Sequence, residues 1–440
     1  MYLRKFQIEN IRSIDSLTLD FDRGHEAGWH VILGSNGSGK SSVVRSLALL
    51  CMGEKEAYAA RQDFSRWLRR GEEHAKITGT FSFDRDFDTI SGGGYPSPKP
   101  VVAEAVLTED DNIFSGVVNI AYSGERVNRT IWGSGAGWFS ASFGPFRRFT
   151  GGDRLYDRLF VSNRRLAPHL TALGEDVALT EALTWLTSLH IQSLQDEKNK
   201  SSSSHAQEIM DLVKNFINNS GFLPHNAKIE EVTNEYVFIK DGNGNYINLE
   251  SLSDGYRSAL SLVFELIRQM FELYGFELVI KSLSDDGSII KLPGVVAIDE
   301  VDAHLHPTWQ QEIGRWLTTF FPMVQFIVTT HSPIICRAIA RQDGSQAGSI
   351  WKLPVPGSGA AFQRIRGVDY DQLVFGDVLD AYSTELFGAH VTRSKLGGDL
   401  LERLAKLNNK AIDEGLTDEE RAERSSLRKT FPAEATTGSE

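Results

Sequence analysis

The feature of this sequence that constrains its fold most is the segment GSNGSGKS at residues 34–41, which matches the pattern G-x-x-x-x-G-K-[ST] in full. An apolar run at residues 29–33 precedes it and predicts a buried strand, and the run at residues 42–50 predicts a helix. A glycine-rich turn between a strand and a helix presents backbone N–H groups and the positive end of the helix to phosphate. The pattern therefore predicts an α/β fold that binds ATP and Mg²⁺.

Two side chains of this segment carry most of its chemistry. We expect Lys40 to reach the β- and γ-phosphates and to act in catalysis, and we expect the Ser41 hydroxyl to bind Mg²⁺. A glycine- and serine-rich turn could match the pattern by accident, but here the flanking strand and helix are the ones that the chemistry requires. The residues expected to hold the nucleotide are Asn36, Gly37, Ser38, Gly39, Lys40, Ser41 and Ser42.

A second apolar run, at residues 295–298, ends in the paired acids Asp299 and Glu300. Ligands of open α/β sheets bind at the carboxyl ends of the strands, which is where these two carboxylates would lie. We expect Asp299 to hold Mg²⁺ through its water shell and Glu300 to act as the general base for the attacking water. An acidic pair without a function at the end of a strand would produce the same pattern.

Two polar segments complete the candidate site. In LSDGY, residues 252–256, the side chains of Ser253 and Asp254 with Gly255 start a predicted helix and would form a second phosphate-binding surface, or simply cap that helix. His331 follows the apolar run VQFIV and would contact the γ-phosphate, unless it is a buried core histidine.

Composition narrows the remaining possibilities. The chain has 440 residues, 41% of them hydrophobic, which is enough to bury a sizeable core. No apolar run reaches the roughly 18 to 20 residues that span a bilayer, and the first residues lack a signal peptide, so we expect a cytoplasmic protein without membrane contact. The two cysteines form no CxxC pair, which excludes cysteine zinc sites.

The formal net charge of −12 disfavours nucleic-acid binding over the whole surface, but two local basic clusters could still contact phosphate. The alternatives are solvated helix faces or ion pairs with an acidic neighbouring subunit. The first cluster, between residues 147 and 165, contains Arg147, Arg148, Arg154, Arg158, Arg164 and Arg165. The second contains Arg61, Arg66, Arg69 and Arg70.

The order of these four motifs resembles an ABC-type ATPase head of the SMC, RecF and OLD group. The stretches KFQIENIRSIDSLTLDF and IDEVDAHLHPTWQ resemble the same group. The resemblance covers residues 1–60 and about 225–370, and it makes residues 34–41 the Walker A motif, Asp299 and Glu300 the end of Walker B, LSDGY the signature, and His331 the switch histidine.

The resemblance also has weak points. The signature departs from the transporter form LSGGQ at Asp254 and Tyr256, and an acid at that place is familiar in the RecF and OLD group. Gln62 is a candidate for the glutamine loop, although no clear strand precedes it. Residues 301–303 would form the D-loop. His304 and His306 are interpreted as helix-entry residues in preference to metal ligands.

The resemblance implies a mixed sheet around the P-loop with an antiparallel β-subdomain, a helical insertion and a helical C-terminal region. We expect residues 1–60 and 225–370 to form a discontinuous ATPase head. Residues 61–150 would be the β-rich part of the insertion, residues 151–224 its helical part, and residues 371–440 a helical region that binds a partner.

The tail, from YDQLVFGDVLDAYSTELFG to LTDEERAERSSLRKTFP, is similar to that of PtuA-type ATPases of Septu and retron-linked antiphage systems. This likeness implies an ATPase that regulates a partner HNH nuclease of the PtuB type and has no nuclease site of its own. In the ABC design the signature of one chain closes over the nucleotide of another, so the likeness also implies a homo-oligomer, at least a dimer and under this hypothesis a larger one. Two alternatives remain open: a stand-alone RecF-like DNA-repair ATPase that binds DNA in an ATP-dependent way, and a nucleotide-sensing scaffold without catalysis.

Overall fold

The chain divides into two compact units, Met1–Phe375 and Gly376–Glu440. The mixed α/β fold class expected from the sequence is confirmed, with a P-loop sheet, an antiparallel sheet and several helices in the first unit. The computed structural model describes residues 1–60, 63–90, 98–109, 118–133, 138–145, 147, 163, 165–174, 180–199, 204–341, 345–377, 381–382, 395–413 and 415–431.

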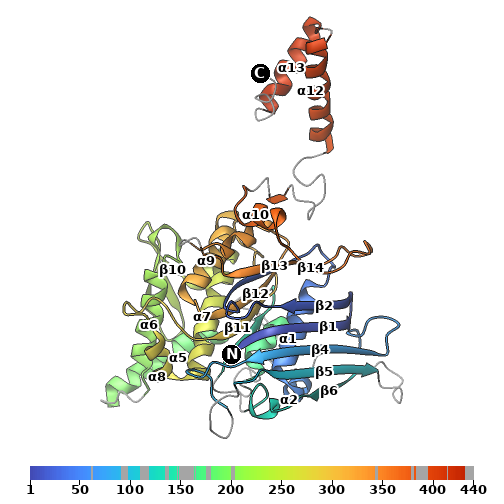
Figure 1. Ribbon diagram of the computed structural model, residues 1–440. Coiled ribbons are helices and arrows are strands. Elements are labelled where there is room, and N and C mark those ends of the chain that lie inside the picture. Colours follow the sequence, from blue (N-terminus) through green and yellow to red (C-terminus); the bar gives the residue numbers. More distant parts are fainter. Residues whose placement is uncertain are drawn as a thin grey trace. The chain divides into compact units, whose positions relative to one another are not determined.

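A six-stranded sheet with the order β14-β13-β3-β12-β11-β7 forms the centre of the first unit (Figure 1). Its strands pair in parallel except for β14, which is antiparallel to β13. Because β3, β12 and β11 are parallel neighbours, the residues that follow them meet at one edge of the sheet. The strands are β3 (Gly28–Leu33), β7 (Ser140–Phe143), β11 (Gly294–Ile298), β12 (Val324–Thr330), β13 (Gly348–Lys352) and β14 (Gln363–Arg364).

A five-stranded antiparallel sheet with the order β2-β1-β4-β5-β6 packs with the helix α1 (Lys40–Met52) in one continuous apolar core, and that core also takes in side chains of β11 and β12. Nearly every residue of α1 is buried, because the helix contacts strands of both sheets. The strands are β1 (Tyr2–Ile11), β2 (Ile14–Asp20), β4 (His74–Ser82), β5 (Val101–Glu109) and β6 (Val118–Ser123).

Residues on both sides of the expected division at residue 60 share the same sheets. Strands β4, β5 and β6 pair with the strands that precede α1, and β7 pairs with the Walker B strand β11, so residues 61–150 contribute to both sheets of the head. Alternation in the sequence indicates that these strands exist, but it does not indicate which strand each one pairs with.

The remaining part of the first unit is mostly helical. A long helix, α7 (Asp254–Tyr274), is buried on almost all sides from Ser258 onward and contacts α5. The other longer helices of the first unit are α5 (Thr180–Asn199), α6 (Ala206–Asn219), α8 (Phe276–Ser282), α9 (Pro307–Phe320) and α10 (Val368–Val374). A small antiparallel sheet contains β8 (Lys228–Val232), β9 (Val237–Lys240) and β10 (Tyr246–Asn248). The short helical segments are α2 (Glu54–Ala59), η1 (Val127–Arg129), η2 (Ala167–His169), α4 (Leu170–Leu173), η3 (Pro224–Asn226), η4 (Leu249–Ser251) and η5 (Pro333–Ile339).

The second unit is a helical hairpin of α12 (Lys395–Asp413) and α13 (Asp418–Thr430). Its buried core consists of Leu404, Leu407 and Leu427, and a capping box of Thr417 and Glu420 starts α13. The boundary between the units follows Phe375, five residues after the division at 370 that the sequence suggested. Among the helices in the described ranges, each is too short or too polar to cross a membrane.

A buried histidine lies in the P-loop strand itself. His30 Nε2 is 2.7 Å from the carbonyl oxygen of Glu26 and must donate to it, so Nδ1 accepts from the Ser349 hydroxyl at 2.7 Å. Burial lowers the pKa of His30 from 6.5 to about 4, because the imidazolium would lose its hydration. The strand therefore carries a neutral imidazole at neutral pH.

We expect this histidine to make the fold sensitive to acid. Its pKa is lower in the folded chain than in the unfolded one, so its contribution is present above about pH 6.5 and is lost as the pH falls toward 4. The loss should reach about 3 kcal/mol in the free energy of unfolding. Urea unfolding of wild type and His30→Gln at neutral and acidic pH measures it. An equal pH dependence in the two proteins would contradict the assignment.

Candidate functional site

The P-loop adopts the backbone that its glycines allow. Gly37 and Gly39 have φ angles of 79° and 102°, in the left-handed region, and α1 begins at the next residue. The Lys40 ammonium donates to the carbonyl oxygens of Gly34 and Ser35 at 3.0 and 3.1 Å. Ser38 Oγ is buried and, within the described part of the chain, has no hydrogen-bond partner. A buried P-loop hydroxyl without a partner fits an oxygen of a phosphate.

The Walker B acids follow β11 and are oriented by the neighbouring strand. Asp299 is buried, and the Thr329 hydroxyl donates to its Oδ1 at 2.6 Å. The same hydroxyl accepts from the backbone N–H of Glu300 at 2.9 Å. Glu300 has a φ angle of 44°, which is uncommon for a residue with a side chain. Thr329 therefore orients the carboxylate of Asp299 and the backbone of Glu300, a role that no pattern in the sequence indicated.

His331 follows β12 at the same edge of the sheet and is 62% exposed, which excludes the core-histidine alternative. Its Nδ1 lies 3.5 Å from Oδ2 of Asp302, a buried carboxylate that also accepts from the Thr330 hydroxyl. The imidazole is thus held at the surface of the site, with one edge toward the D-loop.

A guanidinium of the first basic cluster, for which nucleic-acid contact was one of the expected roles, belongs to this site instead. Arg147 is buried, and its Nη1 donates to the carbonyl oxygens of Gly144 at 2.9 Å and Asp299 at 2.8 Å. Its Nη2 donates to the carbonyl oxygens of Glu300 at 3.1 Å and Val301 at 3.4 Å. A buried guanidinium with its N–H groups directed inward cannot contact a nucleic acid. The prediction that Arg147 of the first basic cluster contacts phosphate of a nucleic acid is therefore wrong.

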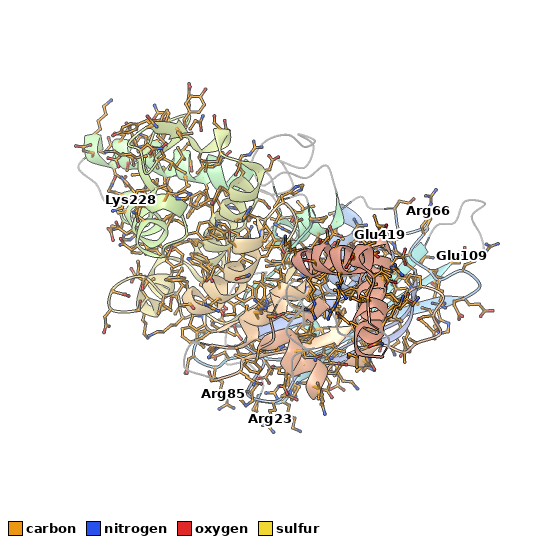
Figure 2. All side chains as sticks on the ribbon, turned by 90° about the horizontal axis from the view of Figure 1, so that it is seen from above. Arg23, Arg66, Arg85, Glu109, Lys228 and Glu419 are labelled. Carbon is orange, nitrogen blue, oxygen red and sulfur yellow. The ribbon has the colours of Figure 1, made fainter. Side chains whose placement is uncertain are left out.

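The other described member of that cluster is also engaged inside the chain. Arg165 lies 3.6 Å from a carboxylate oxygen of Glu56 and donates to the carbonyl oxygen of Met52 at 3.4 Å. In the second cluster, the side chain of Arg66 extends from the surface (Figure 2). The remaining predicted residues Arg61, Gln62, Arg148, Arg154, Arg158 and Arg164 lie outside the described residues.

A cleft of about 1020 Å³ opens beside Gly37 and Ser38, between the turn that joins β1 to β2 and the loop that follows β13. Its walls include Arg12, Arg69 and Phe362. The Arg12 guanidinium lies 5.1 Å from the centroid of the Trp67 ring, and burial lowers its pKa. The position beside the P-loop and the mixture of cationic and apolar walls suit the nucleoside part of a bound nucleotide.

The signature segment starts α7, with exposed side chains at Ser253 and Asp254. A Cβ atom at Gly255 would lie 2.6 Å from the carbonyl oxygen of His304, so this position requires glycine for close packing on the turn after Walker B. The Trp309 indole donates to the Tyr256 hydroxyl at 3.3 Å. His306 caps α9 by accepting from the backbone N–H of Thr308.

The P-loop, the Walker B acids and His331 are thus brought together, because β3, β12 and β11 end side by side. The signature segment is not joined to them: among the described residues, no hydrogen bond or ion pair links residues 253–255 to the P-loop.

The hydroxyl of Thr329 provides a direct test of how Asp299 is oriented. We expect Thr329→Val to weaken the apparent Mg²⁺ affinity by about 10- to 100-fold, as losses of a ligand's orienting partner do. ATP turnover measured across a Mg²⁺ titration reports it. The matched control is Thr318→Val, which removes a buried hydroxyl bonded within α9. An unchanged Mg²⁺ requirement in Thr329→Val would show that the hydroxyl does not orient a metal ligand.

Comparisons with known proteins identify a family and several relatives of this chain. The family described as "AAA domain, putative AbiEii toxin, Type IV TA system" matches residues 30–337. The Septu protein PtuA of Bacillus mycoides (strain KBAB4) is 25% identical over 77% of this chain and 39% of the relative. The Retron Ec83 probable ATPase of Escherichia coli is 34% identical over 33% of this chain and 24% of the relative. The chain therefore spans well under half the length of these relatives.

Among solved structures, an SMC head bound to the C-terminal winged-helix domain of ScpA aligns with 83% of this chain and 97% of its own, at 15% identity and a TM-score of 0.48. The sequence resemblance to ABC-type ATPases of the SMC, RecF and OLD group, and to PtuA-type ATPases within it, is confirmed by the family match and the relatives.

Proposed function

The chain belongs to the AAA-domain family that matches residues 30–337, and from this membership and its site we propose that it binds and hydrolyses ATP to regulate a partner nuclease in antiphage defence. One observation carries the enzymatic part of the proposal. Lys40, Asp299 and Glu300 follow or border strands that end side by side, with His331 at the same edge. This arrangement supports a site in which the Lys40 ammonium binds phosphate and the two acids hold Mg²⁺ and accept a proton.

The residues present fit ATP and Mg²⁺. The P-loop offers a phosphate the buried Ser38 hydroxyl, which has no hydrogen-bond partner among the described residues, and the Ser41 hydroxyl and the Asp299 carboxylate would hold Mg²⁺. Mg²⁺ supplies charge neutralisation of the phosphates when it is bound. Glu300 accepts the proton of the attacking water, and His331 contacts the γ-phosphate from the end of β12.

The signature segment supports a site shared between two copies of the chain. Ser253 and Asp254 are exposed at the start of a helix whose N–H groups would attract phosphate, yet the described contacts leave them apart from their own P-loop. A second copy that presents this segment to the nucleotide completes the site, and ATP then joins the two chains. A homo-oligomer, at least a dimer, follows from this sharing.

The relatives support the biological part of the proposal. They are called a Septu protein and a retron ATPase, and the tail of this chain resembles PtuA-type ATPases, which act beside an HNH nuclease. The helical hairpin of the second unit has three buried leucines in its core, while Leu396 and Ile412 are 67% and 82% exposed. Exposed apolar side chains on a hairpin with so small a core suit a surface that binds a partner.

The experiment that tests the regulatory part measures native mass by light scattering. The Glu300→Gln variant is measured with and without ATP and Mg²⁺, alone and with the product of an HNH gene adjacent to this one. A defined homo-oligomer that captures the HNH protein is expected. A nucleotide-dependent dimer that ignores the HNH protein would contradict nuclease regulation and favour the RecF-like alternative.

A further inference from the structure

The buried guanidinium of Arg147 joins three separate parts of the head. Besides the four carbonyl oxygens already described, its Nε donates to the hydroxyl of Ser258 at 3.3 Å, and Ser258 is itself buried. The acceptors belong to the loop after β7, to the Walker B turn after β11, and to the second turn of α7, the helix that begins with the signature. No other side chain offers five N–H donors in one rigid plane.

The charge of Arg147 is retained despite its burial. Burial lowers the pKa of the guanidinium to about 10, and the nearby carboxylates of Asp299, Asp302 and Glu300 act in the opposite direction. The group is therefore a cation at neutral pH, surrounded by the three acids that the Walker B turn contributes. A buried cation of this kind is retained only where its hydrogen bonds are satisfied, and here five acceptors satisfy it.

The Walker B turn needs such a restraint. Glu300 has its φ angle at 44°, and a side-chain-bearing residue keeps a left-handed backbone only where the surrounding structure fixes it. Arg147 binds the carbonyl oxygens of Asp299, Glu300 and Val301, which lie on both sides of that φ angle. The guanidinium thus restrains, together with the Thr329 hydroxyl, the backbone from which the Glu300 side chain starts.

We propose that Arg147 is a positioning residue that ties the Walker B turn to the signature helix of the same chain, so that a shift of α7 on engaging nucleotide is transmitted to Glu300 through Ser258. The proposal rests on the proposed function, since hydrolysis is what Glu300 performs. It assigns Arg147 no contact with nucleotide. Arg147 and Ser258 should therefore affect kcat and leave ATP affinity unchanged.

The experiment compares Arg147→Lys, Ser258→Ala and the double variant in steady-state hydrolysis and in the binding of a fluorescent, non-hydrolysable ATP analogue. Lysine keeps the charge but cannot reach acceptors in three elements, so we expect kcat to fall by about 10- to 100-fold with affinity within about twofold of wild type. Ser258→Ala should lower kcat by a few-fold. The double variant should be no slower than Arg147→Lys, because both changes remove the same contact between residues 147 and 258.

The matched control is Arg165→Lys, at a second partly buried arginine whose carbonyl and carboxylate contacts lie away from Walker B. It should keep the wild-type kcat and affinity. Wild-type kcat in Arg147→Lys, a parallel loss of kcat and affinity, or multiplicative effects in the double variant would each overturn the proposal. If Arg147→Lys does not fold, the kcat of Ser258→Ala tests the proposal by itself. A wild-type kcat in that variant would show that the contact between Arg147 and α7 does not position Glu300.

Failure of this inference and failure of the proposed function give different results. An inactive wild-type protein, or a Glu300→Gln variant as active as wild type, would contradict the proposed function itself. Normal wild-type hydrolysis that requires Glu300 but ignores Arg147 and Ser258 would contradict the positioning role alone.

Discussion

Replacing Glu300 with glutamine is expected to lower kcat for ATP hydrolysis by about 10²- to 10⁴-fold while ATP still binds, because removal of a general base costs this much. Glutamine keeps the size of the side chain but cannot accept a proton from water. The backbone around it should not change, since the N–H of residue 300 donates to Thr329 and its carbonyl oxygen accepts from Arg147. Phosphate release and retention of labelled ATP after gel filtration measure the two effects.

The control for this variant is Glu277→Gln, which makes the same change at an exposed glutamate in the first turn of α8. It should hydrolyse ATP at the wild-type rate. Wild-type turnover by Glu300→Gln would show that another group takes the proton, and the nucleotide-sensing scaffold would then become the better description of the chain. Loss of ATP binding in Glu300→Gln would instead indicate a structural role for the carboxylate.

The parts of the fold that could be predicted from the sequence are those that local patterns determine. The strand, glycine-rich turn and helix around Lys40 are adjacent in the chain, and the apolar run before Asp299 is short and bounded. The pairing of strands is not local. That β7 lies beside β11, or that β4 pairs with β1, depends on packing between segments far apart, so residues 61–150 were expected to form an insertion instead of completing both sheets.

The site shows the same limit. Lys40, Asp299 and His331 are found by motif, but Thr329 and Arg147 act through single contacts that carry no motif. In the sequence Arg147 is one of several arginines in a basic stretch, and net charge cannot distinguish a buried guanidinium from an exposed one. The local signal was the Gly144-Pro145 pair two residues before it, which marks the end of a strand and a turn.

Two inactive variants should restore activity when they are mixed. Lys40→Ala removes the ammonium that is proposed to bind phosphate. Ser253→Arg places a large side chain where, in the proposed shared site, a second chain's nucleotide would fit, so each protein alone should hydrolyse no ATP. In a mixed dimer, the P-loop of the Ser253→Arg chain meets the intact signature of the Lys40→Ala chain. One of two sites is then complete, and an equal mixture should recover about one quarter of the wild-type rate.

The control for the mixture uses changes on the same side of the shared site. Lys40→Ala mixed with Glu300→Gln should stay inactive, because Walker A and Walker B of one chain serve the same nucleotide and neither site in the mixed dimer is complete. Recovery in that mixture would indicate that Walker A and Walker B of two different chains serve one nucleotide. No recovery in the first mixture, with mixed oligomers demonstrated by differential tags, would mean that the exposed Ser253 acts within its own chain and that ATP does not join two copies.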